Sequence, residues 1–300
     1  MRWEDFRQSS NVEDDREASA SRGLPGGGGI GIGMIIILTL LGWLFGINPA
    51  ALINGAQILT GGGGMEQTAP APEVGAGTPG DPTGQFVAAV LGSTEDVWKQ
   101  IFAAAGKTYN PPRLRLFSVS EPTPCAPAKS AMGPFYCPRD QRIYLDTSFF
   151  NDLQNKFGGC SNSNACKFSE AYVIAHEVGH HVQDELGILP RVTQAQQAAS
   201  SQSEVNALQV RVELQADCFA GVWANHAQQT HHFLDPGDVD QALQTAAAIG
   251  DDRLQREMQG YVVPDSFTHG TSAQRRRWFL AGYNSGKVSD CNTLQANVRL

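Results

Sequence analysis

The stretch AYVIAHEVGHHVQDEL, residues 171–186, decides the fold, because it places an H-E-x-x-H motif on an apolar helix. Val173 and Ile174 supply part of the apolar face of a helix that packs into a core. His176 and His180 are one helical turn apart, so their imidazoles project from the same face. Two imidazoles at that spacing can bind one zinc ion.

Glu177 and Gly179 complete the motif. Glu177 is too far around the helix to share the metal easily, but it is well placed to take a proton from a water that the metal activates. Gly179 lowers helix propensity by about 1 kcal/mol, which is understandable if another backbone packs closely there. The alternative, a surface helix with charged His and Glu pairs, gives no reason for the glycine.

A third protein ligand is expected from VELQADCFAGVW, residues 212–223. Glu213 is the candidate ligand, and Asp217, one turn later, can accept a hydrogen bond from the second ring nitrogen of His176. Three protein ligands leave the fourth zinc position for water, as in catalytic sites. The alternative is a helix with two solvated carboxylates. Its apolar residues favour burial, and a buried carboxylate needs a partner.

These motifs resemble those of the gluzincin metallopeptidases. With HEVGHHVQ, ELQADCFAGVW and THGTSAQR, the chain is similar to the bacterial neutral zinc metallopeptidase family over nearly its whole length. The resemblance implies a gluzincin-like fold, one Zn²⁺ ion and hydrolysis of protein or peptide substrates. It implies no known substrate.

The THGTSAQR element contains His269 and Arg275. It resembles an element in which a His and an Arg steady the oxyanion of the tetrahedral intermediate, so both residues are candidate catalytic groups. Gly270 stands where those relatives often have proline, so a different loop geometry is expected here. In the alternative, His269 is a loop residue and Arg275 a solvated residue of a helix's first turn.

Hydrophobic periodicity and capping signals predict an α+β, mostly α-helical domain over residues 85–300, with a small β element and one preceding transmembrane helix. The predicted strands are 114–119 and 142–146, and either is a candidate to pair with an extended substrate. The predicted helices are 94–105, 147–157, 169–186, 201–229, 235–249 and 271–286.

Three further segments precede this domain. Residues 1–29 are polar and then Gly-rich, and we expect a disordered cytoplasmic tail. Residues 30–47 contain no charge and are about 27 Å long as a helix, which predicts a transmembrane helix. Residues 48–84, rich in Gly and Pro, are expected to be a flexible linker. A buried soluble helix or a cleaved signal peptide would be the alternative for 30–47.

Basic residues predict the orientation of that helix. The positive-inside rule places the N-terminus in the cytoplasm and the domain in the periplasm or outside the cell, as a single-pass protein of the inner (cell) membrane. The arginines that support this orientation are Arg2, Arg7, Arg16 and Arg22.

The charge and the six cysteines narrow the function further. A net charge of −8 argues against nucleic acid as a partner. No C-x-x-C pair occurs, so a zinc ribbon is not expected. Disulfides suit an extracytoplasmic domain. The expected pairs are Cys125–Cys137, Cys160–Cys166 and Cys218–Cys291, and six buried free thiols are the alternative.

A second class of function stays open at this stage. A zinc-stabilised binding or scaffold module would keep the metal ligands without turnover, although it has no use for Glu177. The remaining histidines are expected to be structural or exposed, namely His181, His226, His231 and His232. The oligomeric state is not indicated by the sequence.

Overall fold

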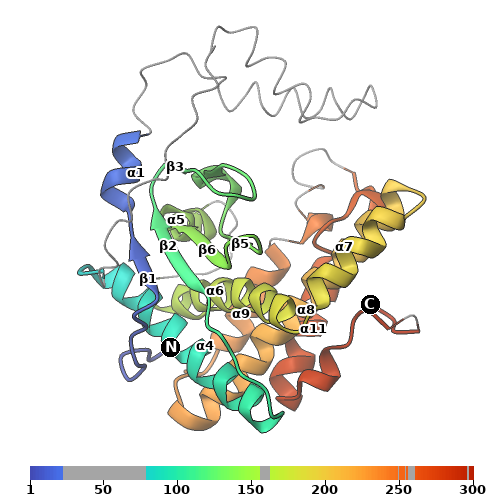
Figure 1. Cartoon of the computed structure of the whole chain (residues 1–300). Helices are drawn as coiled ribbons and strands as arrows, with labels where there is room; N and C mark the ends of the chain where they lie inside the picture. The colour runs from blue at the N-terminus through green and yellow to red at the C-terminus, as the bar shows by residue number, and fades with distance from the viewer. Residues whose placement is uncertain (23–78, 156–162, 249, 254, 256–260, 296) are drawn as a thin grey trace, which may run out of the picture. The chain divides into compact units, whose positions relative to one another are not determined.

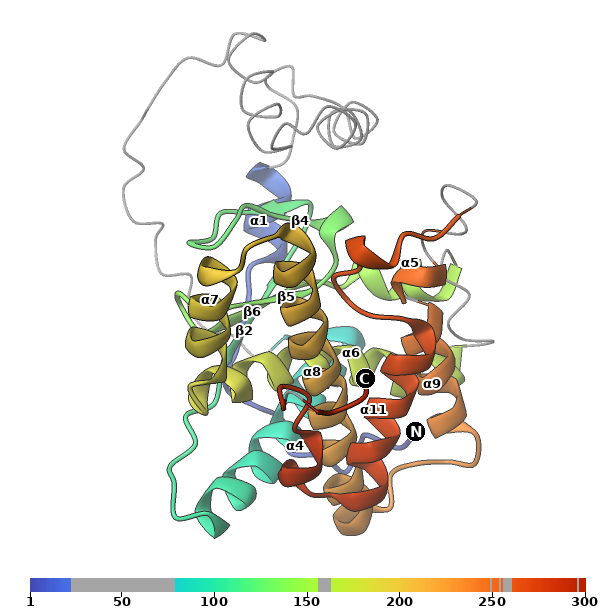
Figure 2. The ribbon, with the colours of Figure 1, turned by 90° about the vertical axis from the view of Figure 1, so that its right-hand side faces the viewer.

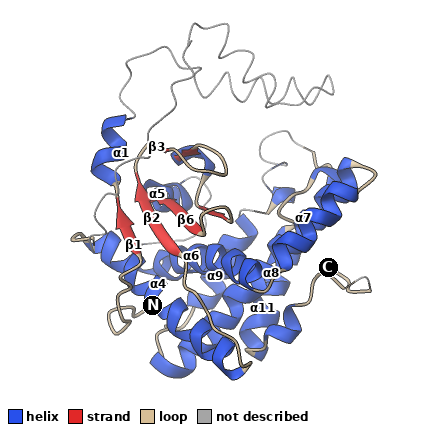
Figure 3. Ribbon diagram, in the orientation of Figure 1, coloured by secondary structure: helices blue, strands red, loops and turns tan. Residues whose placement is uncertain are grey.

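Helices make up most of the described part of the chain, and a four-stranded sheet and a separate two-stranded sheet complete it (Figure 3). Met1–Ala20 and the chain from Gly75 onward form one compact unit. The predicted membrane helix 30–47 lies outside the described residues, as does most of the linker. Within the described part of the chain, no helix is both long and apolar enough to cross a membrane. The computed structural model describes residues 1–22, 79–155, 163–248, 250–253, 255, 261–295 and 297–300.

The sheet has four strands in the order β1-β2-β6-β5 (Figure 1). β1 (Val12–Asp14) and β2 (Arg113–Phe117) are parallel, as are β2 and β6 (Arg142–Asp146). β5 (Phe135–Cys137) runs antiparallel to β6 and forms one edge. Two strands in this sheet were predicted, β2 and β6, whereas β1 and β5 were not.

The predicted role of β2 or β6 in substrate pairing is wrong. Each lies between two other strands, so its backbone hydrogen-bonding groups on both sides are used inside the sheet. β5 is the edge nearest the H-E-x-x-H helix, because it contacts that helix directly. A separate two-stranded antiparallel pair follows β2 and consists of β3 (Ser120–Glu121) and β4 (Ala128–Lys129).

The helices agree with most of the predicted ones. Asp81 caps the first long helix through its side chain, so the helix begins earlier than predicted and the domain begins before residue 85. Thr271 and Gln274 form the predicted capping box of the last long helix. The helices are α4 (Pro82–Ala104), α5 (Ser148–Asn155), α6 (Ser163–Glu185), α7 (Ile188–Ala198), α8 (Gln202–His231), α9 (Asp238–Ala248) and α11 (Ser272–Ser285).

α8 is the central helix of this arrangement. It packs against α6, which bears the H-E-x-x-H motif, and against α11. Figure 2 shows α7 and α11 beside it. α7 was not predicted, because its polar surface lacks a long apolar repeat. Short 3₁₀ turns complete the chain at Ser130–Met132 (η1), Pro264–Ser266 (η2) and Val288–Cys291 (η3).

The prediction of a disordered N-terminal tail is wrong for residues 1–22. They contain β1 and the helix α1 (Arg16–Arg22), and β1 lies alongside β2 in Figure 1. Phe6 and Val12 are buried in the main core. A low average hydropathy hid these contacts, because only a few apolar side chains in the segment enter the core.

Two of the expected disulfides are present. Cys125 joins Cys137, and Cys218 joins Cys291. The alternative of free thiols is therefore wrong for these four residues. Cys160 lies outside the described residues, so its expected bond with Cys166 stays a prediction.

Candidate metal centre

The two histidines of the motif lie on the inner face of α6. His176 is buried, and its Nδ1 donates to Asp217 Oδ1 at 2.9 Å. His180 Nδ1 donates to Gln183 Oε1 at 2.9 Å. Because both Nδ1 atoms are hydrogen-bonded away from the cavity, both Nε2 atoms are directed to the same point.

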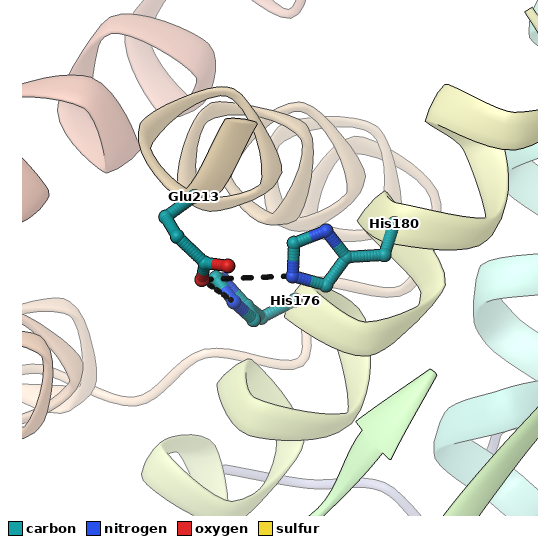
Figure 4. A group of neighbouring side chains, drawn as sticks. All are labelled: His176, His180 and Glu213. Atoms are coloured by element: carbon teal, nitrogen blue, oxygen red, sulfur yellow. Dashed lines mark hydrogen bonds and ion pairs between the residues drawn. The ribbon is translucent and has the colours of Figure 1, made fainter. Parts of the chain in front are cut away.

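Glu213 of α8 completes a three-residue group (Figure 4). Its Oε2 lies 3.2 Å from His176 Nε2 and 3.6 Å from His180 Nε2. Ligand atoms on one tetrahedral zinc ion are roughly 3.4 Å apart, given metal–ligand bonds of about 2.0–2.2 Å. Both distances to Glu213 therefore match the spacing of zinc ligands, and all three candidate ligand atoms lie within 4.8 Å of one another.

Gly179 allows the two ligand-bearing helices to approach each other. A Cβ at this position would lie 3.0 Å from the Ala216 carbonyl oxygen and 3.1 Å from its Cα. The close backbone contact that the sequence suggested is therefore present. It brings α6 near enough to α8 for side chains on both to reach a common ion.

Asp217 is the centre of a buried polar network. Besides His176, it accepts from Arg275 Nε at 2.9 Å and Nη2 at 2.9 Å, and it contacts the Tyr172 hydroxyl. Burial alone would raise the pKa of Asp217, but Arg275 and His176 lower it to about 2. The predicted hydrogen bond to His176 is present, and Asp217 stays ionised while it holds the imidazole.

The protonation of the ligands bears on metal binding. Burial alone would lower the pKa of His176, but Asp217 and Glu213 raise it to about 10. Burial alone would raise the pKa of Glu213, but His180 and His176 hold it well below its usual value. The metal-free site therefore pairs imidazolium with carboxylate, and a metal ion must displace protons from the imidazoles.

Glu177 faces the same cavity without joining the ligand group. It is 7% exposed and accepts a hydrogen bond from the Tyr136 backbone on β5. Burial raises the pKa of Glu177, although His180 and His176 oppose the shift. A carboxylate whose pKa is raised towards neutrality can both accept and return a proton near neutral pH.

His269 also lines the cavity, and Asp251 holds it there. The His269 Nδ1 lies 3.2 Å from Asp251 Oδ1, and the His269 backbone N–H donates to Asp251 Oδ2 at 2.6 Å. The hydrogen bond with Asp251 raises the pKa of His269, although burial opposes the shift. Its side chain is about half exposed. Sequence reasoning missed Asp251, since nothing in the spacing links it to His269.

Arg275 is buried, so the alternative that it is a solvated residue of the helix's first turn is wrong. It is 2% exposed, and its guanidinium contacts Asp217 and the Tyr172 hydroxyl. The structure therefore brings Arg275 to the carboxylate that holds His176. Its neighbour Arg276 is exposed.

Two glutamines that orient the ligands were also missed. Gln183 is fully buried, and its Nε2 donates to the Val212 carbonyl at 2.8 Å, which leaves its Oε1 to accept from His180. Gln209 Nε2 donates to Glu213 Oε1 at 2.8 Å. Each lies about one helical turn from the ligand it contacts. That spacing was a usable signal for both.

Replacement of Gln183 by leucine is expected to lower zinc affinity by about 10–100-fold, because His180 loses the acceptor that fixes its ring. Competition with a chelator of known affinity measures this change. Thermal unfolding of the metal-free variant is the control for folding. An unchanged affinity in a folded Gln183→Leu chain would show that His180 needs no such support.

A cavity of about 460 Å³ opens beside the ligand group. The H-E-x-x-H residues, Glu213, His269 and Arg275 all line it. Its other walls are largely apolar and include Met132, Phe135, Phe149, Leu189 and Val192. A water molecule and a segment of extended peptide both fit a space of this size.

Two of the other histidines have structural contacts. His181 is buried between the Tyr136 hydroxyl, at 3.1 Å, and the Asn110 carbonyl, at 2.6 Å. His226 Nε2 lies 2.9 Å from the Gly286 carbonyl. Both contacts confirm the expectation that these residues are structural.

Comparison with known proteins agrees with this geometry. A family model described as "Putative neutral zinc metallopeptidase" matches residues 1–294. The uncharacterized protein YpfJ of Escherichia coli (strain K12) is 44% identical over 99% of this chain and 100% of its own length. The uncharacterized protein Rv2575 of Mycobacterium tuberculosis (strain ATCC 25618 / H37Rv) is 39% identical over 84% of this chain and 85% of its own. No solved structure matches the chain.

Proposed function

The chain belongs to the neutral zinc metallopeptidase family, and on that premise we propose that it hydrolyses peptide bonds with one zinc ion held by His176, His180 and Glu213. One observation supports this most directly. A buried carboxylate, Glu177, shares the cavity with the three candidate ligands without joining their hydrogen bonds. A purely structural zinc site has no use for such a group.

Glu177 acts as the general base in this proposal. When bound, zinc supplies Lewis acidity that activates a water molecule and polarises the scissile carbonyl. Glu177 takes a proton from the attacking water and returns it to the nitrogen of the leaving amine. The raised pKa of Glu177 suits this second step, because a more basic carboxylate holds the proton until the amine departs.

His269 serves as the donor to the developing oxyanion. Asp251 raises the pKa of His269, which favours its cationic form. His269 precedes α11 and lines the cavity. A positioned donor of this kind stabilises the charge that forms in the transition state. Arg275 has a different role in this proposal. It keeps Asp217 ionised and in place, and so orients His176.

The substrate is a protein or peptide with apolar residues next to the scissile bond. The apolar cavity walls favour such side chains. Among the described residues, the only acidic or basic side chains of its lining, histidines included, are the three candidate ligands, Glu177, His269 and Arg275. The outer edge of β5 faces no other strand among those described, so it is a better candidate than β2 or β6 for pairing with an extended peptide.

The domain acts outside the cytoplasm and is attached to the membrane through residues 30–47. Two disulfides in the described part of the chain support an oxidising compartment. The uncharged segment is long enough to enter a bilayer. Proteins or peptides of that compartment are therefore the proposed substrates.

Metal removal tests the enzyme directly. The purified full chain is expected to bind a single zinc ion and to cleave a peptide library beside apolar residues. Chelation should abolish cleavage, and added zinc should restore it. Saturating zinc should also stabilise the chain, by about 2.7 kcal/mol at a hundred times its Kd. A chain that gains this stability but cleaves nothing would be a scaffold module.

A further inference from the structure

The N-terminal segment, residues 1–20, is joined to the catalytic domain by backbone hydrogen bonds at Arg2, at Ser9 and along β1. β1 pairs with β2 along its whole length, from Val12 opposite Leu114 to Asp14 opposite Leu116. Before β1, the Ser9 N–H donates to the Ala88 carbonyl at 2.9 Å. The segment therefore adds a strand to the sheet and also lies along α4.

Buried charges make this association specific. Arg115 of β2, which is 12% exposed, donates to Asp15 at 2.8 Å and lies 3.7 Å from Glu13. Asp15 is 2% exposed and Glu13 is 8% exposed. If the segment left the domain, Arg115 would lose two of its carboxylate partners.

The contact with α4 is too close for a side chain on that helix. A Cβ at Gly92 would lie 2.0 Å from the Arg7 carbonyl oxygen. Arg7 Nη2 donates to Glu95 at 2.6 Å and to Asp96 at 2.9 Å, both on α4. Gly92, Glu95 and Asp96 therefore form a surface on α4 that is complementary to this part of the N-terminal segment.

Arg16 is likewise paired within the fold. It donates to Asp14 at 2.8 Å and also contacts Asp81, the capping residue of α4. Arg7 and Arg16 were two of the arginines from which the sequence predicted a cytoplasmic N-terminus. The positive-inside rule applies to cations in the loops beside a membrane helix. Arginines whose charge is matched by carboxylates of a folded domain are weak evidence for orientation.

We infer that residues 1–20 lie on the same side of the membrane as the catalytic domain, and that both lie outside the cytoplasm. Hydrogen-bonded strands are about 4.8 Å apart, whereas the hydrocarbon core of a bilayer is about 30 Å thick, so β1 and β2 cannot pair across it. The inference replaces the predicted cytoplasmic N-terminus and single crossing. It rests on contacts of the fold, and only the choice of the outer side comes from the proposed function.

Side-specific labelling of the full chain tests this inference. Ser10 and Ser203 are both exposed, the first in the N-terminal segment and the second on α8. Ser10→Cys and Ser203→Cys are the smallest changes that introduce a reactive thiol at each place. Spheroplasts that express each variant are treated with a membrane-impermeant maleimide before or after lysis, and the wild-type chain measures the background.

Both variants are expected to react fully before lysis. Reaction of Ser203→Cys before lysis but of Ser10→Cys only after it would overturn the inference, as would the reverse pattern. If both react only after lysis, the shared side stands, but the outer placement of the domain fails. None of these labelling results depends on peptidase activity. A failure of the proposed peptidase function would appear only in the cleavage assay.

Discussion

Replacement of Glu177 by glutamine is expected to lower peptide hydrolysis by about 10²–10⁴-fold while zinc still binds. Glutamine keeps the size of the side chain and its hydrogen-bonding capacity but cannot accept the proton of the attacking water. The candidate ligands His176, His180 and Glu213 are unchanged, so the proposed metal site is expected to persist. The measurement is kcat/KM on a cleaved peptide, with metal content determined on the same sample.

The stability of the Glu177→Gln chain distinguishes a catalytic role from a structural one. Burial raises the pKa of Glu177, which means that folding disfavours its ionised form. A neutral glutamine removes this cost, so stability is expected to stay the same or increase. Glu185→Gln, on the same helix but outside the cavity lining, is the control and should keep full activity. Equal activity in the two variants would exclude Glu177 as the base.

Replacement of Arg275 by methionine is expected to destabilise the chain by about 3–5 kcal/mol. Arg275 is 2% exposed and provides two hydrogen bonds to Asp217. Methionine fills a similar volume but takes one of two cationic partners from the buried Asp217 carboxylate and leaves it only His176. Denaturant unfolding of the metal-free chain measures the loss. Arg276→Met, at the exposed neighbouring position, is the control and should change stability by less than about 0.5 kcal/mol.

The same substitution should also weaken zinc binding through His176. Without Arg275 the pKa of Asp217 rises, and Asp217 becomes a poorer acceptor for the His176 Nδ1 proton. The double variant Arg275→Met, Asp217→Asn should recover part of the lost stability, because it no longer buries a carboxylate that lacks its guanidinium partner. If Arg275→Met were as stable as Arg276→Met, the guanidinium would not be what neutralises Asp217. A catalytic role at the oxyanion would then again be open for Arg275.

Much of the candidate metal centre could be predicted because its signals are local. His176 and His180 share a helix face through backbone geometry alone, and so do Glu213 and Asp217. The presence of a buried helix around each pair also followed from apolar residues nearby in sequence. The capping box at Thr271 needed only residues three apart.

Other parts of the site depended on long-range contacts. Asp251 reaches His269, and Arg275 reaches Asp217 over 58 residues. No sequence periodicity connects such positions. Arg275 was therefore predicted to stabilise the oxyanion of the intermediate, and its contact with the Asp217 carboxylate was not predicted. The edge strand β5 was missed because a three-residue strand has too few residues to show an alternating pattern.

The sequence by itself determined the two helices with their candidate ligands, the likeness to a metallopeptidase family and two correct disulfide pairs. The spacing of side chains on a helix follows from covalent geometry and short-range hydrogen bonds. It can therefore be predicted from local sequence alone. Only the tertiary structure decided that the N-terminal segment is a strand of the domain, because β1 pairs with residues about 100 positions away. Its stabilisation comes from a partner strand and from buried carboxylate–arginine pairs, neither of which is visible in the local composition.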